Sequence, residues 1–156
     1  PMSERVFDRL EDLLDRHGVQ YDVLRHEAVH TSQQAARVRG TPLASGAKAL
    51  ICKGDDRVVM FVLPADRRLD SREIRRQQNW RRLRFLSREE VFELTGLEPG
   101  AIPPFGQLFG LPTLCDRRLG ENERINFNAG DHCISVGMNY ADYVRTESPE
   151  LGEFAE

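Results

Sequence analysis

Hydrophobic positions recur along this chain at two spacings, one typical of helices and one typical of strands. Apolar residues between 6 and 14 fall on one face of a helix, and Gly18 is placed to end that helix. Apolar and polar residues then alternate from 19 to 23, which predicts a half-buried strand that runs toward His26. The chain therefore opens with a helix that packs on a core, followed by a strand.

Polar residues that can cap helices mark where further helices begin. Two helices should start at a capping box, formed by Thr31 with Gln34 and by Ser87 with Glu90. The first of these helices should end at Gly40 and the second at Gly96. Asp70 and Asn139 are placed to cap two more short helices.

Apolar stretches between these helices predict a largely antiparallel sheet. Residues 49–53 and 57–63 are separated by three turn residues, which predicts a hairpin. Further strands are expected at 83–86, 107–115, 124–128 and 133–138. The predicted class is α+β: one domain over residues 2–147, with a mostly antiparallel, barrel-like sheet and surrounding helices. The tail over residues 148–156 should fray.

The composition is that of an ordinary globular domain and argues against several classes of protein. The chain has 156 residues, of which 40% are hydrophobic and 30% charged. No apolar run approaches the roughly 20 residues of a membrane span, and no signal sequence is evident, so we expect a cytoplasmic protein without a membrane partner. The three cysteines form no CxxC pair, so neither a disulfide framework nor a zinc site is indicated, and no metal or cofactor is expected.

Charge is distributed unevenly along the chain. The formal net charge is −3, yet nine arginines and only two carboxylates lie between Arg67 and Arg88. This segment therefore carries +7, which leaves −10 for the rest of the chain. Such asymmetry fits a surface that binds a polyanion. It fits equally well a solvated, arginine-rich helix face that has no partner.

Two features in apolar surroundings are candidates for chemistry. Lys48 stands at the start of an apolar strand in SGAKALICK, so its ammonium must snorkel to solvent or line a pocket, and the residue alone favours snorkelling. The loop EPGAIPPFG, residues 98–106, cannot form a regular element because of its prolines and glycines. Its amides can bind a carbonyl oxygen if they point inward. Alternatively, the loop is a rigid connector that packs Phe105.

Three histidines complete the candidates. His132 lies in FNAGDH, a turn between two strands, where an imidazole can be exposed and ionisable near neutral pH. Histidine in such a turn is also common as a plain polar residue. His26 and His30 flank a strand end and can line the same cleft, but HEAVH lacks a third ligand, so we reject a metal site. The absence of GxSxG, Walker and GxGxxG motifs means that a standard nucleophilic hydrolase is not indicated.

Taken in order, six segments of the chain resemble the YbaK/ProX family. They are YDVLRHEAVHTSQQAA, GAKALICK, VVMFVLPADRRLD, LSREEVFELTGLEPGAIPPFG, LPTLCD and FNAGDHCISVGMNYADY. The similarity covers nearly the whole chain and rests on the order and spacing of the segments. The fold of this family is also that of the editing domain inserted in bacterial prolyl-tRNA synthetases.

The resemblance implies trans-editing, the metal-free hydrolysis of the ester between a mischarged amino acid and the terminal adenosine of a tRNA. Lys48 matches the family's functional lysine, and His132 occupies its late glycine-histidine turn. Gly100 and Pro104 match the ends of its Gly-x-x-x-Pro loop. These four are the expected catalytic residues. Few side chains are needed, because an aminoacyl ester is already activated and requires only positioning, water and oxyanion stabilisation.

Further residues are expected to contact the substrate. The expected substrate-binding set is His26, Thr31, Ala49, Ala101, Ile102, Pro103, Phe105, Gly106 and Gly130. The expected tRNA-binding set, from the arginine-rich segment, is Arg75, Arg76, Arg81 and Arg82. The expected partner is an aminoacyl-tRNA, and an aminoacyl-tRNA synthetase is a further candidate.

Two departures from the family pattern leave the amino acid open. Ala49 stands where relatives often carry threonine or asparagine, and Pro103 stands where serine is common. Both changes remove a side-chain hydrogen-bond donor, so esters of alanine, serine, threonine and cysteine are all candidates. Two other functions compete with deacylation. One is a non-catalytic tRNA- or protein-binding module of the same fold, and the other is a small-molecule esterase, in which the arginine segment would have no purpose.

Overall fold

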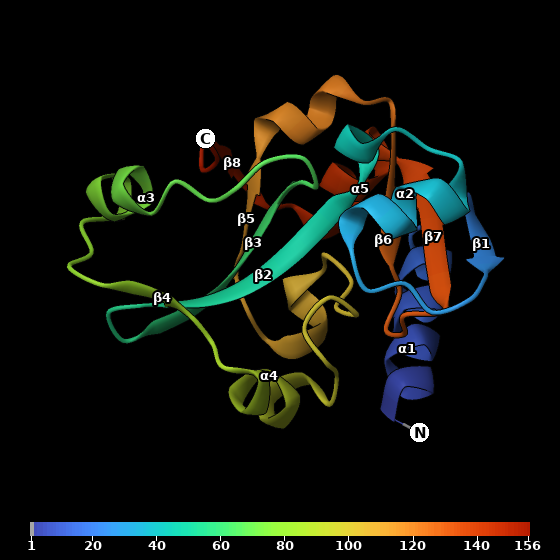
Figure 1. Ribbon diagram of the computed structural model, residues 1–156, viewed down its shortest axis with the longest axis horizontal. Helices are drawn as coiled ribbons and strands as arrows, with labels where there is room; N and C mark the ends of the chain where they lie inside the picture. The colour runs from blue at the N-terminus through green and yellow to red at the C-terminus, as the bar shows by residue number, and fades with distance from the viewer. Residues whose placement is uncertain (1) are drawn as a thin grey trace.

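The computed structural model describes residues 2–156, with side chains from Arg5 onward, and its elements alternate along the chain (Figure 1). The α-helices are α1 (Met2–Arg16), α2 (Ser32–Arg39), α3 (Ser71–Gln78), α4 (Arg88–Thr95) and α5 (Tyr140–Glu147). The strands are β1 (Tyr21–Arg25), β2 (Ala47–Gly54), β3 (Arg57–Pro64), β4 (Leu83–Phe85), β5 (Thr113–Asp116), β6 (Arg124–Asn128), β7 (Ile134–Asn139) and β8 (Glu150–Gly152). Three 3-10 helices complete the set: η1 (Leu43–Ser45), η2 (Gly106–Phe109) and η3 (Arg117–Glu121). None of the described helices has the length and apolar character that crossing a membrane requires.

The strands form two sheets. One has the order β1-β7-β6 and is antiparallel throughout, and the other has the order β4-β2-β3-β5-β8. In the larger sheet β5 pairs in parallel with both β3 and β8. The α+β class and the largely antiparallel pairing are confirmed, but the described strands do not close into a barrel. A bridge between Gly46 and Asn126 joins the two sheets in place of a continuous ladder.

The core lies on both faces of the larger sheet. Met60 and Val62 of β3 belong to the main cluster, which α1 and the smaller sheet complete. Phe61, from the opposite face of β3, packs in a second cluster with Ile74 of α3 and Phe154. Because both faces of β3 are buried, this strand is a continuous apolar run and not an alternating one.

The predicted caps position the short helices. Ser87 and Glu90 form a complete capping box at the start of α4. At α2, Thr31 accepts a hydrogen bond from the amide of Gln34, as expected for an N-cap residue. The Gln34 side chain accepts from the amide of His30, one residue earlier than in a standard box. This bond fixes His30 at the entrance of α2.

One predicted strand is shorter than expected. Residues 107–115 were expected to be extended, but only the last part pairs as β5, because residues 106–109 form the 3-10 helix η2. The Gly106 amide donates to the Thr113 hydroxyl at 3.0 Å, which folds the intervening residues into a tight turn. A Cβ atom at Gly106 would lie 2.6 Å from the carbonyl oxygen of Leu111, so the turn requires glycine.

The expectation that residues 148–156 fray is wrong. Strand β8 pairs with β5, and Phe154 is only 2% exposed. The buried carboxylate of Asp116 accepts hydrogen bonds from the amides of Phe154 and Ala155 and from the Arg118 side chain. Burial alone would raise the pKa of Asp116, but these hydrogen bonds outweigh it and lower the pKa. The tail is therefore part of the domain.

This arrangement predicts that Phe154→Ala destabilises the whole domain. The substitution leaves a cavity in the second core cluster, and such losses typically lower the free energy of unfolding by about 3–5 kcal/mol. Urea denaturation would measure the loss. Phe92→Ala is the matched control, because Phe92 is 54% exposed and its loss should change stability by about 0.5 kcal/mol or less. Equal stability of the two variants would mean that the tail does not contribute to the fold.

Candidate active site

A cavity of about 340 Å³ opens between α2, β2 and the loop that begins at Glu98. Six of the predicted site residues line it: Lys48, Thr31, Ala49, Gly100, Ile102 and His132. They come from segments far apart in the sequence, which the fold brings to one place. The other predicted residues lie outside the cavity wall.

The end of β4 explains why the cavity lies against β2. Strand β3 pairs with the whole of β2, from Ala47 to Gly54. On the other edge, β4 pairs only with the stretch from Cys52 to Gly54. The cavity is lined by β2 residues 47–50, beyond the point where this pairing stops. The cavity therefore borders the part of β2 that is paired on one edge only.

Lys48 lies on this wall, opposite Leu63 in the hairpin register. Burial lowers the pKa of Lys48, an effect that nearby Asp66 partly offsets and Arg68 adds to. The ammonium is half-buried at the cavity. Of the two interpretations of this lysine, its position favours the one in which it lines a pocket.

The loop between Glu98 and Phe105 is held in place by hydrogen bonds to Asn128 and Gly130. Gly100 has a φ of +89°, a conformation that glycine adopts without strain, and its carbonyl accepts from the Asn128 side chain at 2.8 Å. The carbonyl of Ala101 accepts from the Gly130 amide, also at 2.8 Å. The loop is thereby fastened to β6 and to the turn that follows it.

Most of the remaining predicted loop residues face the core. The ring of Phe105 packs between Phe127 and Tyr143, and the carbonyl of Pro104 accepts from the Tyr143 hydroxyl at 2.7 Å. The Phe105 amide donates to the Pro103 carbonyl, so it does not point into the cavity.

Two more loop amides are also occupied within the protein. The Gly106 amide is bonded to Thr113, and the Ala101 amide donates to the carbonyl of Glu98. The expectation that the loop amides point inward therefore does not hold for these residues.

His132 lies closer to the interior than expected. Its ring stacks at a 45° tilt on His30, with 4.9 Å between the ring centroids, and both residues line the cavity. Its Nε2 lies 3.5 Å from a carboxylate oxygen of Glu98. Both ring nitrogens are buried and, among the described residues, neither has a hydrogen-bond partner. The expected exposed turn histidine is in fact a cavity residue with unused hydrogen-bonding capacity.

His26 does not line the cavity. Its Nε2 lies 2.8 Å from the hydroxyl of Ser135, and its Nδ1 lies 2.7 Å from the carbonyl of Glu27. Gly130, also outside the cavity, acts through its amide, which anchors Ala101. Both residues support the site and do not form its wall.

Sequence reasoning missed a half-buried arginine at the cavity. Arg39, the last residue of α2, donates from Nε to the Ser135 hydroxyl and from Nη2 to the side-chain Oδ1 of Asn128, both at 2.8 Å. Burial lowers the pKa of Arg39 to about 10. No carboxylate within the described chain pairs with it. Its partners lie 89 and 96 residues away, so no local pattern signals the network.

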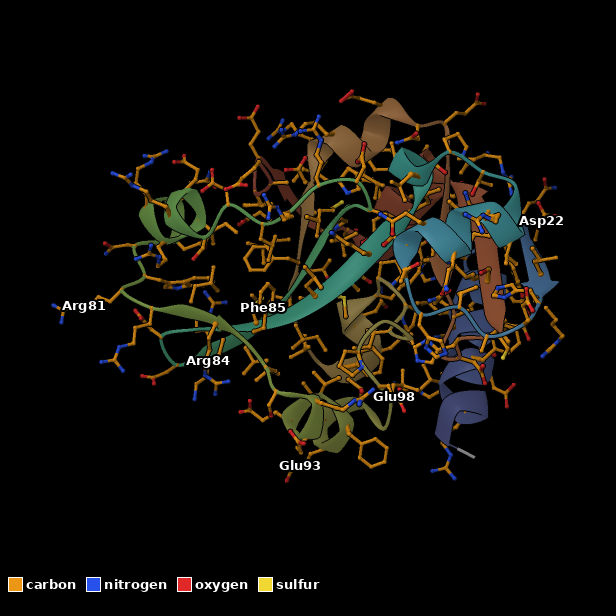
Figure 2. The ribbon with its side chains drawn as sticks, in the orientation of Figure 1. Asp22, Arg81, Arg84, Phe85, Glu93 and Glu98 are labelled. Atoms are coloured by element: carbon orange, nitrogen blue, oxygen red, sulfur yellow. The ribbon has the colours of Figure 1, made fainter. Side chains whose placement is uncertain are left out.

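The four predicted tRNA-binding arginines lie on α3 and on the approach to β4, at the opposite end of the molecule from α2 (Figure 1). Arg76, Arg81 and Arg82 are exposed, and Arg75 is half-buried. The backbone amides of Arg81 and Arg82 donate to the Asp55 carboxylate, which ties this segment to the β2–β3 turn. Figure 2 shows the Arg81 side chain extending outward at the edge of the molecule.

Acidic, histidine and cysteine side chains do not gather into a metal site in residues 2–156. Cys52 and Cys115 are buried and Cys133 is exposed, and all three are free thiols.

Comparison with known proteins gives the family. The sequence profile of the aminoacyl-tRNA editing domain matches residues 26–146. The chain belongs to this family. The match includes all the residues that line the cavity, from Val29 to His132 along the sequence.

Individual relatives agree with this membership of the editing domain family. The multifunctional Ser/Thr-tRNA deacylase ProXp-y of Escherichia coli K12 is 40% identical over 151 residues, which cover 94% of this chain and 90% of the relative. The proline–tRNA ligase of Shouchella clausii is 32% identical over 124 residues, or 78% of this chain and 22% of the ligase. The crystal structure of hypothetical protein APE2540 shares the fold, with a TM-score of 0.85 at 21% identity, covering 94% of this chain and 99% of that one.

The network at Asn128 predicts that Asn128→Ala loosens the loop. The variant loses the bond to the Gly100 carbonyl, so amides of residues 98–106 should exchange faster with deuterated solvent, because local opening becomes easier. Asn126→Ala is the matched control on the same strand, since Asn126 bonds the Ser45 hydroxyl and not the loop. Unchanged exchange in residues 98–106 of Asn128→Ala would contradict the anchoring role.

Proposed function

We propose that this protein is a trans-editing deacylase that hydrolyses the ester of a small, wrongly attached amino acid on a tRNA. The observation that carries the proposal is the meeting of Lys48, Gly100 and His132 at one cavity. Membership of the editing domain family supports it, as does the near full-length similarity to a Ser/Thr-tRNA deacylase.

The cavity supplies what ester hydrolysis needs. The ester is already activated, so its position relative to water and to charge decides the rate. Lys48 provides a compact cation for a phosphate or ribose oxygen of the terminal nucleotide. The ring nitrogens of His132, which have no hydrogen-bond partner among the described residues, can bind the attacking water or the ester.

The walls favour a small amino acid. Besides Ala49, the cavity is lined by Ala35, Gly46 and Ala47. We propose serine and threonine as the first candidates, since they are the amino acids in the name of the 40% identical relative, with alanine and cysteine as further candidates. The site of action we propose is the cytoplasm, where the tRNA substrate is found. A synthetase is a proposed partner, because a proline–tRNA ligase contains a related segment.

The direct test is incubation with tRNAs charged separately with serine, threonine, alanine, cysteine and proline. We expect release of serine or threonine fastest, measured as loss of labelled amino acid from acid-precipitable tRNA. If no ester is hydrolysed while the charged tRNA still binds, the protein is a non-catalytic module. Hydrolysis of simple amino-acid esters with no preference for tRNA would instead indicate an esterase.

On the best substrate of this panel, Lys48→Ala should lower the deacylation rate on the order of 100-fold, because misplacement of the ester costs about that much. Lys53→Ala is the matched control, since Lys53 lies on the same strand but outside the cavity wall. Lys48→Arg separates charge from shape, because it keeps a cation in a larger planar group. A wild-type rate in Lys48→Ala would remove this residue from the mechanism.

Replacing Arg75, Arg76, Arg81 and Arg82 together by glutamine should weaken tRNA binding and flatten its dependence on salt. Each lost phosphate contact reduces the slope of log K against log salt by about one unit. Filter binding between 50 and 200 mM salt would measure the slope, while the rate at saturating tRNA should stay unchanged. An unchanged slope would mean that this segment is a solvated face without a partner.

A further inference from the structure

Phe85 is the most exposed large hydrophobic side chain of the described chain, at 60%. It lies on β4, the edge strand of the larger sheet, and neither core cluster includes it. Figure 2 shows its place between Arg81, in the arginine-rich segment, and Glu98 at the cavity. A single exposed ring is common on protein surfaces, so its surroundings decide whether it has a function.

The strand register places Phe85 on the same sheet face as Lys48. Phe85 pairs with Cys52, and residues directly opposite each other in a ladder project from the same face. Side chains alternate along a strand, so Cys52, Leu50 and Lys48 also share a face. Lys48 and Cys52 are four residues apart, or about 13 Å along the strand.

Phe85 also lies beside the cavity mouth. Leu50, which lines the cavity, is the diagonal neighbour of Phe85 on the facing strand. Beyond β4 the chain stays close, because the Leu86 amide donates to the Ile51 carbonyl at 3.0 Å. Three residues after Phe85, Arg88 lines the cavity as well. A continuous strip therefore runs from the Phe85 ring over Leu50 to Lys48.

The charges around this ring indicate what it binds. Arg84 and Arg88 flank it in sequence and both are exposed, each in an ion pair with a carboxylate, Glu90 and Glu98 respectively. The predicted tRNA-binding residues Arg81 and Arg82 precede Phe85 on the same segment and form no ion pair within the described residues. An exposed aromatic ring among arginines is the arrangement by which proteins hold single-stranded nucleic acid. A protein or lipid partner would need a broader apolar surface than one ring with charged neighbours on both sides.

We propose that Phe85 is a stacking platform for a base in the unpaired 3′ end of the tRNA, just before the esterified adenosine. With that adenosine at Lys48, the preceding nucleotides run along the strip toward the arginine-rich segment, and one base lies flat on the ring. This inference rests on the proposed deacylase function and adds a binding site outside the cavity. Stacking tolerates any base, so Phe85 contributes affinity and direction and does not select the amino acid.

The test compares a full seryl-tRNA with seryl-adenosine, which lacks the preceding nucleotides. In Phe85→Ala, the KM for the tRNA should rise about 10-fold, in line with the loss of one stacked base, while kcat stays within about two-fold. The loss should be about 10-fold larger on the tRNA than on the short ester. Phe85→Trp should retain wild-type KM, whereas Phe85→Leu, which keeps apolar area without a ring, should behave like alanine.

Phe92→Ala is the matched control, an exposed phenylalanine on α4 that the strip does not include. Equal losses on both substrates, or a normal KM in Phe85→Leu, would overturn the stacking site.

A second measurement does not depend on hydrolysis. A short uncharged RNA with the tRNA 3′ terminus can carry fluorescent 2-aminopurine at the base before the terminal adenosine, and stacking on the ring should quench it. Quenching by wild type and Phe85→Trp, but not by Phe85→Ala, supports the site even if the protein deacylates nothing. Equal quenching by all three variants overturns it, whatever the fate of the proposed activity.

Discussion

The guanidinium of Arg39 is half-buried at the wall of the candidate active site and has only neutral hydrogen-bond partners among the described residues. Burying a cation is costly unless hydrogen bonds replace its water, and bonds to a charged group contribute about 1.5–3 kcal/mol each. Asn128 takes part in this compensation from both ends of its amide: its oxygen accepts from Arg39 and its nitrogen donates to Gly100. One side chain thus couples the end of α2, strand β6 and the loop at the cavity.

The charged residues on the cavity wall favour the binding of anions. Arg39, Lys48 and Arg88 line it, and Glu98, the carboxylate on its described wall, is already paired with Arg88, which leaves Arg39 and Lys48 as two cations without an ion-pair partner in the described chain. A cavity with two cations and low-dielectric walls attracts anions and stabilises negative charge that develops inside it. Both the phosphate of a nucleotide and the oxyanion of an ester under attack fit that description. The site therefore needs no resident negative group to bind its substrate.

Local sequence patterns predicted the elements that are determined by neighbouring residues. The amphipathic first helix, the β2–β3 hairpin, the cap at Ser87 and the turn before His132 all follow from spacing and turn chemistry, and the structure contains each of them. The pairing of β5 with β8 was missed, because a three-residue strand in a polar tail carries no periodic signal and is fixed by Asp116 from a distant segment. The network at Arg39 was missed for the same reason. The editing domain resemblance gave Lys48, Gly100, Pro104 and His132 as the catalytic residues. Three of them line one cavity, whereas Pro104, like the expected substrate-binding residues His26 and Phe105, lies behind its wall.

The early end of β4 separates the edge of the cavity, where β2 is paired on one side only, from the side chains that line its interior. Strand β4 does not pair with β2 residues 47–50, which line the cavity together with α2 and the loop that begins at Glu98. Residues such as Ala49 can then change without closing the entrance. A domain built this way can acquire a new amino-acid preference by single substitutions inside the pocket while its tRNA approach path stays constant. Related proteins in one cell can then each remove a different wrongly attached amino acid.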